Sequence, residues 1–318
     1  MLTAVCMNPA IDRTICVEQL RAGRTNPIIT QHDEAGGKGI NVARAAVRLG
    51  MDARVVGIFG KEQTDFFRKA FSADNICAQV LEFDGATRIN YKVFDLSHRV
   101  ITELNAPGQP ISTQIQERLK QTVYDGVEQG SWVALTGSVP PGTPSGFYAE
   151  MIQKIHAKGG RVALDADGEL LQLGVKESPE LIKPNRAELE KLSGKRIATI
   201  AEAAVAAQLT ASRYGCMVLA SLDVQGAVLA NATGCYQACP CNVTVHTTVG
   251  AGDSMLTGAV AAMEHSAAMP DILAYAIACA ASAVNGATIA SPDLNQVWQL
   301  LGSVAVEQMD FGVKNDAK

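Results

Sequence analysis

The segment Thr247-Thr-Val-Gly250-Ala-Gly252-Asp253-Ser-Met-Leu stands before an alanine-rich run and combines two glycines with an aspartate. Glycines let the backbone approach a ligand closely, and the start of a following helix offers free N–H groups and a positive dipole end. We therefore expect an anion-binding turn here. A carboxylate in such a turn repels phosphate, so Asp253 makes chemical sense as a base that takes a proton from an attacking hydroxyl.

A second glycine cluster, Ala35-Gly36-Gly37-Lys38-Gly39-Ile40-Asn41, also stands before an alanine-rich helical run. Neither cluster fits the P-loop or the dinucleotide fingerprint, because the first lacks a following Lys-Ser or Lys-Thr and the second lacks G-x-G-x-x-G. Taken alone, each cluster is explained by a tight turn, and Asp253 by a helix N-cap. Two clusters that each begin a helix and carry a polar side chain favour a binding site.

The composition excludes several classes of protein. The 318 residues carry a net charge of −5, with 47% hydrophobic and 19% charged residues, which predicts a large α/β core and no surface for nucleic acid. The longest apolar run, residues 272–284, is too short to cross a bilayer, and the N-terminus lacks a basic signal region. With eight cysteines and no such signal, we expect reduced thiols and a cytoplasmic protein with no membrane contact.

Short β-branched runs alternate with amphipathic or alanine-rich stretches along most of the chain. This alternation predicts βαβ units and a mostly parallel sheet, in which ligands bind beyond the carboxyl ends of the strands. The predicted strands are residues 3–7, 53–59, 132–136, 161–165, 181–183, 216–221 and 227–230. The predicted helices are residues 39–49, 64–72, 113–126, 146–157, 186–192, 200–214, 254–263, 270–284 and 294–301.

Two regions, residues 13–30 and 88–103, break this alternation with the polar-apolar pattern of half-buried strands. We expect them to form a small antiparallel sheet that stands off the main one as a lid, within a single domain of residues 1–318. Two ordinary surface hairpins are the alternative. Residues 309–318 are expected to form a mobile tail.

The two glycine clusters together resemble the G-G-K-G-x-N-V-A and T-V-G-A-G-D-S motifs of the ribokinase-like (PfkB) carbohydrate kinases. Three further segments agree in the family's order: Asn8-Pro-Ala-Ile-Asp12, Thr136-Gly-Ser138-Val-Pro-Pro-Gly142 and Lys183-Pro-Asn185-Arg-Ala-Glu188-Leu. The resemblance implies a three-layer α/β sandwich with a mostly parallel central sheet and a small β lid. Residues 8–12, 87–92 and 102–108 are similar to the branch that phosphorylates sugar phosphates, which includes 1-phosphofructokinase and tagatose-6-phosphate kinase.

The resemblance also implies roles for individual residues. Asp253 would be the base, and the backbone of Gly250, Ala251 and Gly252 would form an anion hole for the developing charge. The sugar phosphate would be bound by Asp12, Gly36, Gly37, Lys38, Asn41, Arg88, Asn90 and Ser138. Arg88 would bind the phosphate through two hydrogen bonds from its planar guanidinium group, and Lys92 is a weaker candidate for the same role. For Asp12 and Arg88 alone, a solvated turn and an exposed strand position are the alternatives.

On the nucleotide side, the resemblance implies ATP and Mg²⁺. The nucleotide would be held by Lys183, Asn185, Ser221, Gly226 and Asn285. Glu188 would hold Mg²⁺ mostly through water, because this ion gives up its waters reluctantly. The alternative for Asn185 and Glu188 is an ordinary helix start with an acidic first turn.

The chain departs from the family's pattern in two places. Asp223 stands where members usually have a glycine, and Ala166-Asp167 stand where this branch usually has two hydroxyl residues. Both changes affect the region expected to hold nucleotide phosphates, and an aspartate there repels them. They leave the choice of phosphate donor open.

We therefore expect an ATP-dependent kinase that converts fructose 1-phosphate to fructose 1,6-bisphosphate, with tagatose 6-phosphate and fructose 6-phosphate as alternative acceptors. The resemblance also implies a homodimer formed through the lid. A non-catalytic sugar-phosphate sensor on a kinase scaffold is an alternative of another class. A Rossmann dehydrogenase is weaker, because no G-x-G-x-x-G follows the first predicted strand.

Overall fold

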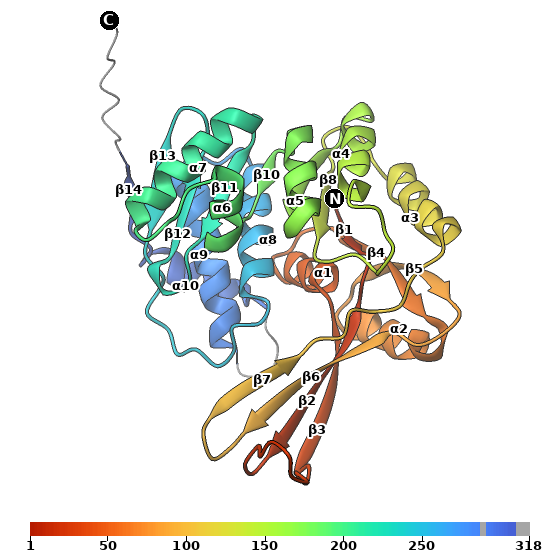
Figure 1. Cartoon of the computed structure of the whole chain (residues 1–318). Helices are drawn as coiled ribbons and strands as arrows, with labels where there is room; N and C mark the ends of the chain where they lie inside the picture. The colour runs from red at the N-terminus through yellow and green to blue at the C-terminus, as the bar shows by residue number, and fades with distance from the viewer. Residues whose placement is uncertain (287–290, 310–318) are drawn as a thin grey trace, which may run out of the picture.

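The computed structural model describes residues 1–286 and 291–309, and these residues are built around one large sheet (Figure 1). Its strands follow the order β14-β13-β12-β11-β10-β9-β8-β1-β4-β5. Their bounds are β1 Leu2–Cys6, β4 Ala53–Gly60, β5 Cys77–Phe83, β8 Trp132–Thr136, β9 Arg161–Asp165, β10 Leu181–Ile182, β11 Met217–Ser221, β12 Ala227–Ala230, β13 Cys235–Ala238 and β14 Val306–Gln308.

Neighbouring strands from β5 to β11 pair in parallel, and β12, β13 and β14 are added antiparallel at one edge. Every residue of β1 and β8 is buried, as expected of parallel strands that are covered on both faces. Because parallel strands end at the same edge, the segments that follow β1, β8, β9 and β10 meet there. This edge carries most of the residues singled out from the sequence.

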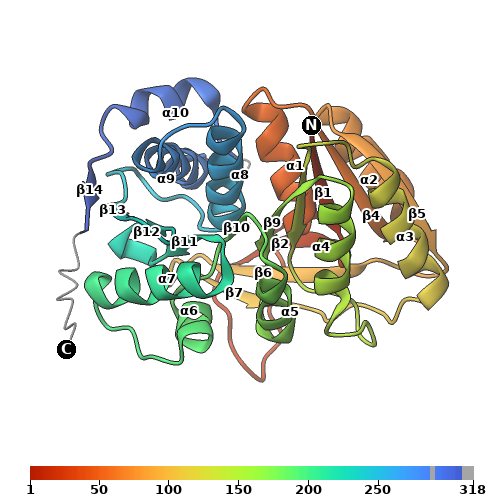
Figure 2. The same ribbon diagram turned by 90° about the horizontal axis from the view of Figure 1, so that it is seen from above.

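Helices cover both faces of the sheet (Figure 2). Their bounds are α1 Lys38–Arg48, α2 Thr64–Ala73, α3 Thr113–Asp125, α4 Phe147–Ala157, α5 Gly168–Gly174, α6 Arg186–Ser193, α7 Ile200–Tyr214, α8 Ala251–Glu264, α9 Met269–Asn285 and α10 Leu294–Leu301. Side chains of α3 to α7 share one apolar core with one face, and those of α1, α2, α8 and α9 share another core with the opposite face. The predicted three-layer α/β sandwich is confirmed.

A second sheet forms the lid, with the strand order β3-β2-β6-β7. Its strands are β2 Ala10–Val17, β3 Thr30–Gly36, β6 Arg88–Asp95 and β7 Val100–Leu104. The prediction of an antiparallel sheet is wrong for its central pair, because β2 and β6 are parallel. β2 follows β1 and β6 follows β5 along the chain. Because β1 and β5 lie in the parallel part of the main sheet, the chain leaves the main sheet in the same direction after each of them (Figure 1).

The sequence missed several elements, namely β3, β5, α5, β13 and β14, and of β3 only Thr30 falls within the predicted lid segment 13–30. β5 has only one buried residue, Leu81, and lies at the sheet edge, and α5 has seven residues, so neither gives a long periodic signal. The predicted tail, residues 309–318, lies outside the described residues except for Met309, whose N–H donates to the Cys235 carbonyl at 2.9 Å. No helix within the described residues is long and apolar enough to cross a membrane.

Candidate active site

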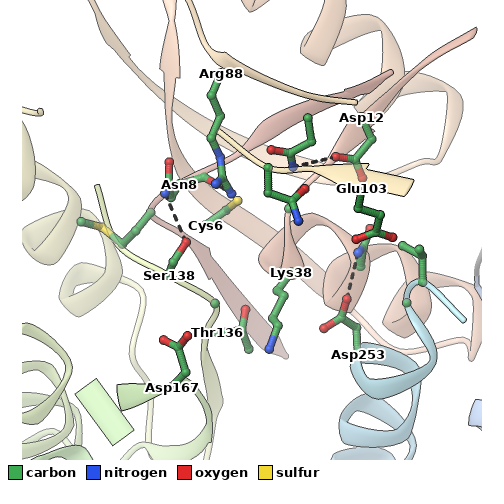
Figure 3. Close-up of a pocket in the computed structure, with 18 of the residues that line it drawn as sticks. Cys6, Asn8, Asp12, Lys38, Arg88, Glu103, Thr136, Ser138, Asp167 and Asp253 are labelled. Carbon is green, nitrogen blue, oxygen red and sulfur yellow. Dashed lines mark hydrogen bonds between the residues drawn. The ribbon is translucent and has the colours of Figure 1, made fainter. Parts of the chain in front are cut away.

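A cavity of about 570 Å³ lies between the lid and the carboxyl edge of the central sheet (Figure 3). It brings together residues from segments that are far apart in the sequence. The predicted residues that line it are Asp12, Gly37, Lys38, Asn41, Arg88, Asn90, Ser138, Glu188, Gly250 and Asp253. A polar cavity bounded on one side by a separate sheet suits a small, hydrophilic ligand.

The first glycine segment forms the start of α8, as predicted. Gly250 is the N-cap residue, with a φ of 76° that favours glycine, and Asp253 lies in the first turn. Asp253 is 5% exposed and is the third residue of the helix, whereas Gly250 occupies the N-cap position. The carboxylate is therefore not used as an N-cap and stays available at the cavity.

The second glycine segment forms the start of α1 and meets α8 across the cavity. Asn41 Nδ2 donates to Asp253 Oδ2 at 2.8 Å, which fixes the carboxylate (Figure 3). Burial raises the pKa of Asp253 to about 6, and the nearby charge of Asp165 adds to this shift, while Lys38, Asn41 and Lys183 oppose it. A carboxylate with such a pKa is ionised at neutral pH and basic enough to accept a proton.

Asp12 is the centre of a polar cluster on the inner face of the lid. Its carboxylate accepts hydrogen bonds from Asn90 Nδ2 and Lys92 Nζ, both at 3.0 Å. Parallel pairing of β2 with β6 sets Asp12 opposite Asn90, so the register of the lid builds this cluster. Gly36 is required beside it, because a Cβ there would lie 2.5 Å from Asp12 Cγ. Lys92 thus contributes more than its weak sequence signal indicated.

Arg88 lines the cavity, but most of the N–H groups of its guanidinium donate hydrogen bonds within the protein. Its guanidinium donates to the backbone carbonyls of Asn8, Pro9 and Ala106 at distances from 2.6 to 3.3 Å. A guanidinium has five N–H groups, so two remain for a ligand. Asn8 Nδ2 also donates to Ser138 Oγ at 3.2 Å, which fixes the hydroxyl at the same end of the cavity.

Lys38 and Lys183 flank the buried carboxylate of Asp165 at the end of β9. Lys38 Nζ donates to Asp165 Oδ1 at 3.0 Å, and Lys183 Nζ lies 3.2 Å from Asp165 Oδ2. Burial alone would raise the pKa of Asp165, but the two lysines hold it below its usual value. The sequence placed Lys38 with the sugar phosphate, whereas the structure places its ammonium group beside Asp165, away from the Arg88 guanidinium (Figure 3).

A second cavity of about 470 Å³ lies behind the glycine loop. Ser221 and Gly226, which the sequence assigned to the nucleotide, line it together with Ala251 and Gly252 of the expected anion hole and apolar side chains that include Met255 and Val284. Its predominantly apolar lining suits a flat heterocycle. Asn285, which the sequence also assigned to the nucleotide, is not among the described residues that line this cavity. It follows Val284 and so points about 100° further around α9.

Asn185 and Glu188 form a capping box at the start of α6, so the helix-start alternative describes their local structure. The backbone N–H and Nδ2 of Asn185 donate to the two carboxylate oxygens of Glu188 at 2.8 and 2.9 Å. Each oxygen keeps a lone pair, and Glu188 lines the first cavity. This donor fits Mg²⁺ held through water and substrate phosphates, which requires only one or two carboxylates.

The two departures from the expected pattern face the cavities. Asp223 has a left-handed φ of 53°, a conformation that aspartate tolerates better than most residues, and it lines the second cavity. Asp167 is exposed and lines the first cavity. Sequence reasoning did not assign a role to Asp165, although its position at the end of a buried strand is the signal that could have found it.

Comparison with known proteins now identifies the family. The family model described as pfkB family carbohydrate kinase matches residues 2–293 of this chain. The chain belongs to this family. The kinase is 34% identical over 261 residues to a 1-phosphofructokinase of Rhodobacter capsulatus, covering 81% of this chain and 82% of the relative. It is 30% identical over 306 residues to a 1-phosphofructokinase of Escherichia coli K12, covering 96% and 98%.

Solved structures agree with the fold of this pfkB-family kinase. Phosphofructokinase-2 from Escherichia coli in complex with substrates and products superposes with a TM-score of 0.89 at 25% sequence identity, covering 95% of this chain and 98% of that one. The same enzyme in complex with fructose-6-phosphate gives a TM-score of 0.89 at 24% identity over the same shares. The chain is therefore a carbohydrate kinase with the ribokinase-like architecture that its motifs indicated.

Proposed function

We propose that this kinase transfers the γ-phosphoryl group of ATP to a hydroxyl of a ketohexose monophosphate, with fructose 1-phosphate as the first choice. The observation that carries the proposal is the position of Asp253. Its buried carboxylate faces the polar cavity under the lid, and Ala251 and Gly252 of the same turn line the apolar cavity behind it. An acceptor hydroxyl and a phosphate donor can thus meet at one helix start.

Charges in the polar cavity support an acceptor that already carries a phosphate. Arg88, Lys92 and Lys38 all line this cavity. Lys92 is paired with Asp12 and Lys38 with Asp165, so Arg88, with N–H groups to spare, is the proposed reader of the phosphate. The two curated relatives named above are both 1-phosphofructokinases, which favours fructose 1-phosphate over tagatose 6-phosphate and fructose 6-phosphate.

In the proposed reaction, Asp253 takes the proton of the acceptor hydroxyl while the oxygen of that hydroxyl forms a bond to the γ-phosphorus. The bond from the γ-phosphorus to the bridging oxygen breaks, and ADP leaves with that oxygen. Backbone N–H groups of Gly250, Ala251 and Gly252 bind the charge that develops on the phosphoryl oxygens. Mg²⁺, held by Glu188 through water, would neutralise charge on the donor phosphates.

ADP release with Mg-ATP tests this proposal against six acceptors: fructose 1-phosphate, tagatose 6-phosphate, fructose 6-phosphate, fructose, ribose and adenosine. We expect rapid turnover with fructose 1-phosphate and none with adenosine. Turnover only with an unphosphorylated acceptor would overturn the proposal and the role of Arg88. Silence with every acceptor and with other nucleotide donors would favour the sensor, which calorimetry would identify by sugar-phosphate binding without tight Mg-ATP binding.

We also propose that two copies associate through the lid. Strand alternation puts Tyr91, Val100 and Leu104 on the face opposite to the residues that line the cavities. Val100 is 52% and Leu104 57% exposed, which is unfavourable for a face that meets only water. Analytical ultracentrifugation should show a dimer that Leu104→Glu dissociates. A monomer at micromolar concentration in the unaltered chain would exclude this association.

A further inference from the structure

Asp165 lies behind the lining of the cavity, in contact with Lys38, and has no role in the proposal so far. It is 2% exposed, and its carboxylate is the common partner of two lysines from different elements. Lys38 begins α1 beside the acceptor cavity, and Lys183 follows β10. A buried carboxylate with one lysine would form a neutral pair, whereas this cluster carries a surplus positive charge.

Lys183 lies directly against the proposed anion hole. A Cβ added to Gly252 would be 3.2 Å from Lys183 Nζ, so the ammonium group touches the loop that would bind phosphoryl oxygens. Its contact with Asp165 Oδ2 at 3.2 Å is an ion pair without an aligned hydrogen bond, and within residues 1–286 and 291–309 that oxygen accepts none. Lys183 is therefore held beside Asp165 by charge, and its N–H groups stay available to a ligand at the loop.

Lys38 reaches the same place from the opposite side. Its side chain is 44% exposed, and Figure 3 shows its ammonium end between Thr136 and Asp253. Burial alone would lower the pKa of Lys38, but the charges of Asp165 and Asp253 hold it above its usual value, so the group is charged. Two ammonium groups at such proximity repel each other unless a carboxylate separates them.

We propose that Asp165 is a positioning residue for phosphoryl transfer. It holds Lys38 on the acceptor side and Lys183 on the loop side, so that both ammonium groups face the phosphoryl group during transfer. This inference rests on the proposed role of Asp253 as the base. Asp165 itself touches neither substrate in this arrangement, and it acts through the two lysines and through its charge.

The charges around Asp253 give the proposal a readout that a merely structural carboxylate would not move. The groups that act on Asp253 are Asp165 at the end of β9, Lys38 and the neutral Asn41 on α1, Lys183 after β10, and Cys6 on β1. Removing Asp165 takes away a negative charge and lowers the pKa of Asp253. Removing Lys38 takes away a positive charge and raises it.

The test compares Asp165→Asn and Lys38→Met in the pH profile of kcat/KM with the best acceptor. For Asp165→Asn we expect kcat to fall roughly 10²-fold, as when oriented stabilising charges are lost, and the acid limb to move to lower pH. For Lys38→Met we expect the acid limb to move to higher pH. The proposal would be overturned if the acid limb of the pH profile stayed unchanged in both variants, or if it moved in the same direction in both.

A second measurement does not depend on the acceptor. Calorimetric titration with Mg-ATP alone should show roughly tenfold weaker binding by Asp165→Asn, because Lys183 loses its anchor at the loop. Equal affinity of both proteins would refute the positioning of Lys183. An unaltered chain that binds Mg-ATP but turns over no sugar would refute the proposed function instead.

Folding is controlled separately. Lys38→Met removes a half-exposed side chain, so it tests the proposal even where Asp165→Asn lowers the melting temperature. Glu150→Gln is the matched control, since Glu150 pairs with the buried Lys120 at 2.6 Å between α3 and α4, away from both cavities. It should lower the melting temperature and leave the pH profile unchanged. A shift of its acid limb would show that such shifts are not specific to the Asp165 cluster.

Discussion

The two cavities that meet at α8 are built by different means. Under the lid, ligand-facing side chains bond to one another: Asp12 to Asn90 and Lys92, and Asn8 to Ser138. Behind the glycine loop, backbone and apolar side chains make up most of the wall. Paired polar groups impose a geometry on their ligand, whereas a smooth apolar wall selects mainly by shape. The choice of sugar should therefore depend on individual side chains far more than the choice of nucleotide does.

Asp253 lies where the two cavities meet, so its loss should have the largest effect. Asp253→Asn keeps the shape and the contact with Asn41 but cannot accept a proton, so kcat should fall roughly 10²-fold or more with little change in sugar affinity. Steady-state kinetics with the best acceptor measures this. Asp271→Asn, in the first turn of the neighbouring α9, should keep full activity. Near-normal turnover by Asp253→Asn would exclude its role as the base.

Arg88 should test the importance of side-chain geometry on the lid side. Arg88→Lys keeps the charge but loses the fork, so KM for a phosphorylated sugar should rise roughly 10-fold or more. The melting temperature should also fall, because backbone carbonyls of Asn8, Pro9 and Ala106 lose their donor. KM for free fructose serves as the control. An equal rise for both sugars would mean that Arg88 supports the cavity but does not read the phosphate.

The pH dependence should report the base at the junction. Asp253 must be ionised to act, and its pKa is raised to about 6, so activity should be full above this value and fall as the pH drops through it. At pH 5 we expect kcat/KM to be about tenfold below its plateau. Circular dichroism at the same pH values separates this loss from unfolding. A profile that stays flat down to pH 4.5 would contradict the raised pKa.

The nucleotide side should respond least. Asp223→Asn removes a charge that repels donor phosphates while keeping a residue that tolerates the left-handed φ of 53°. KM for Mg-ATP should fall by about two- to fivefold, as expected of one partly screened charge, with KM for the sugar unchanged. Asn75→Gly, at a similar φ of 55° on the surface after α2, is the backbone control. A rise in KM for Mg-ATP would indicate that Asp223 helps to hold the donor or its metal.

The sequence predicted long, periodic and capped elements well. For α7 the predicted bounds are those observed, because Thr199 and Glu202 form a capping box and Gly215 ends the helix with a φ of 65°. The edge strand β5 and the short β13 and β14 gave no comparable signal, since their order depends on pairing with distant strands. The parallel pairing of β2 with β6 is likewise a tertiary property that alternation alone does not specify.

For the site, the motifs located the correct residues but not their partners. Asp253 and Asn41 were each singled out, yet their hydrogen bond joins positions 212 residues apart and could not be read from local pattern. Asp165 was missed as a functional residue for the same reason, because its importance comes from Lys38 and Lys183. The reduced freedom of Arg88 depends on carbonyl groups, which carry no signal in the side-chain sequence.

The register of the lid also restricts how this chain can change in length over evolution. Asp12, Asn90 and Lys92 face inward only because each occupies an alternate position of two paired strands. A one-residue deletion in β2 before Asp12 would turn Asp12 outward and bring Arg13 in, exchanging an acidic for a basic group in the cavity. Residues 18–29, outside the lid strands, carry no such constraint. Descendants of this gene should therefore vary by insertion in that loop and only by substitution in β2 and β6.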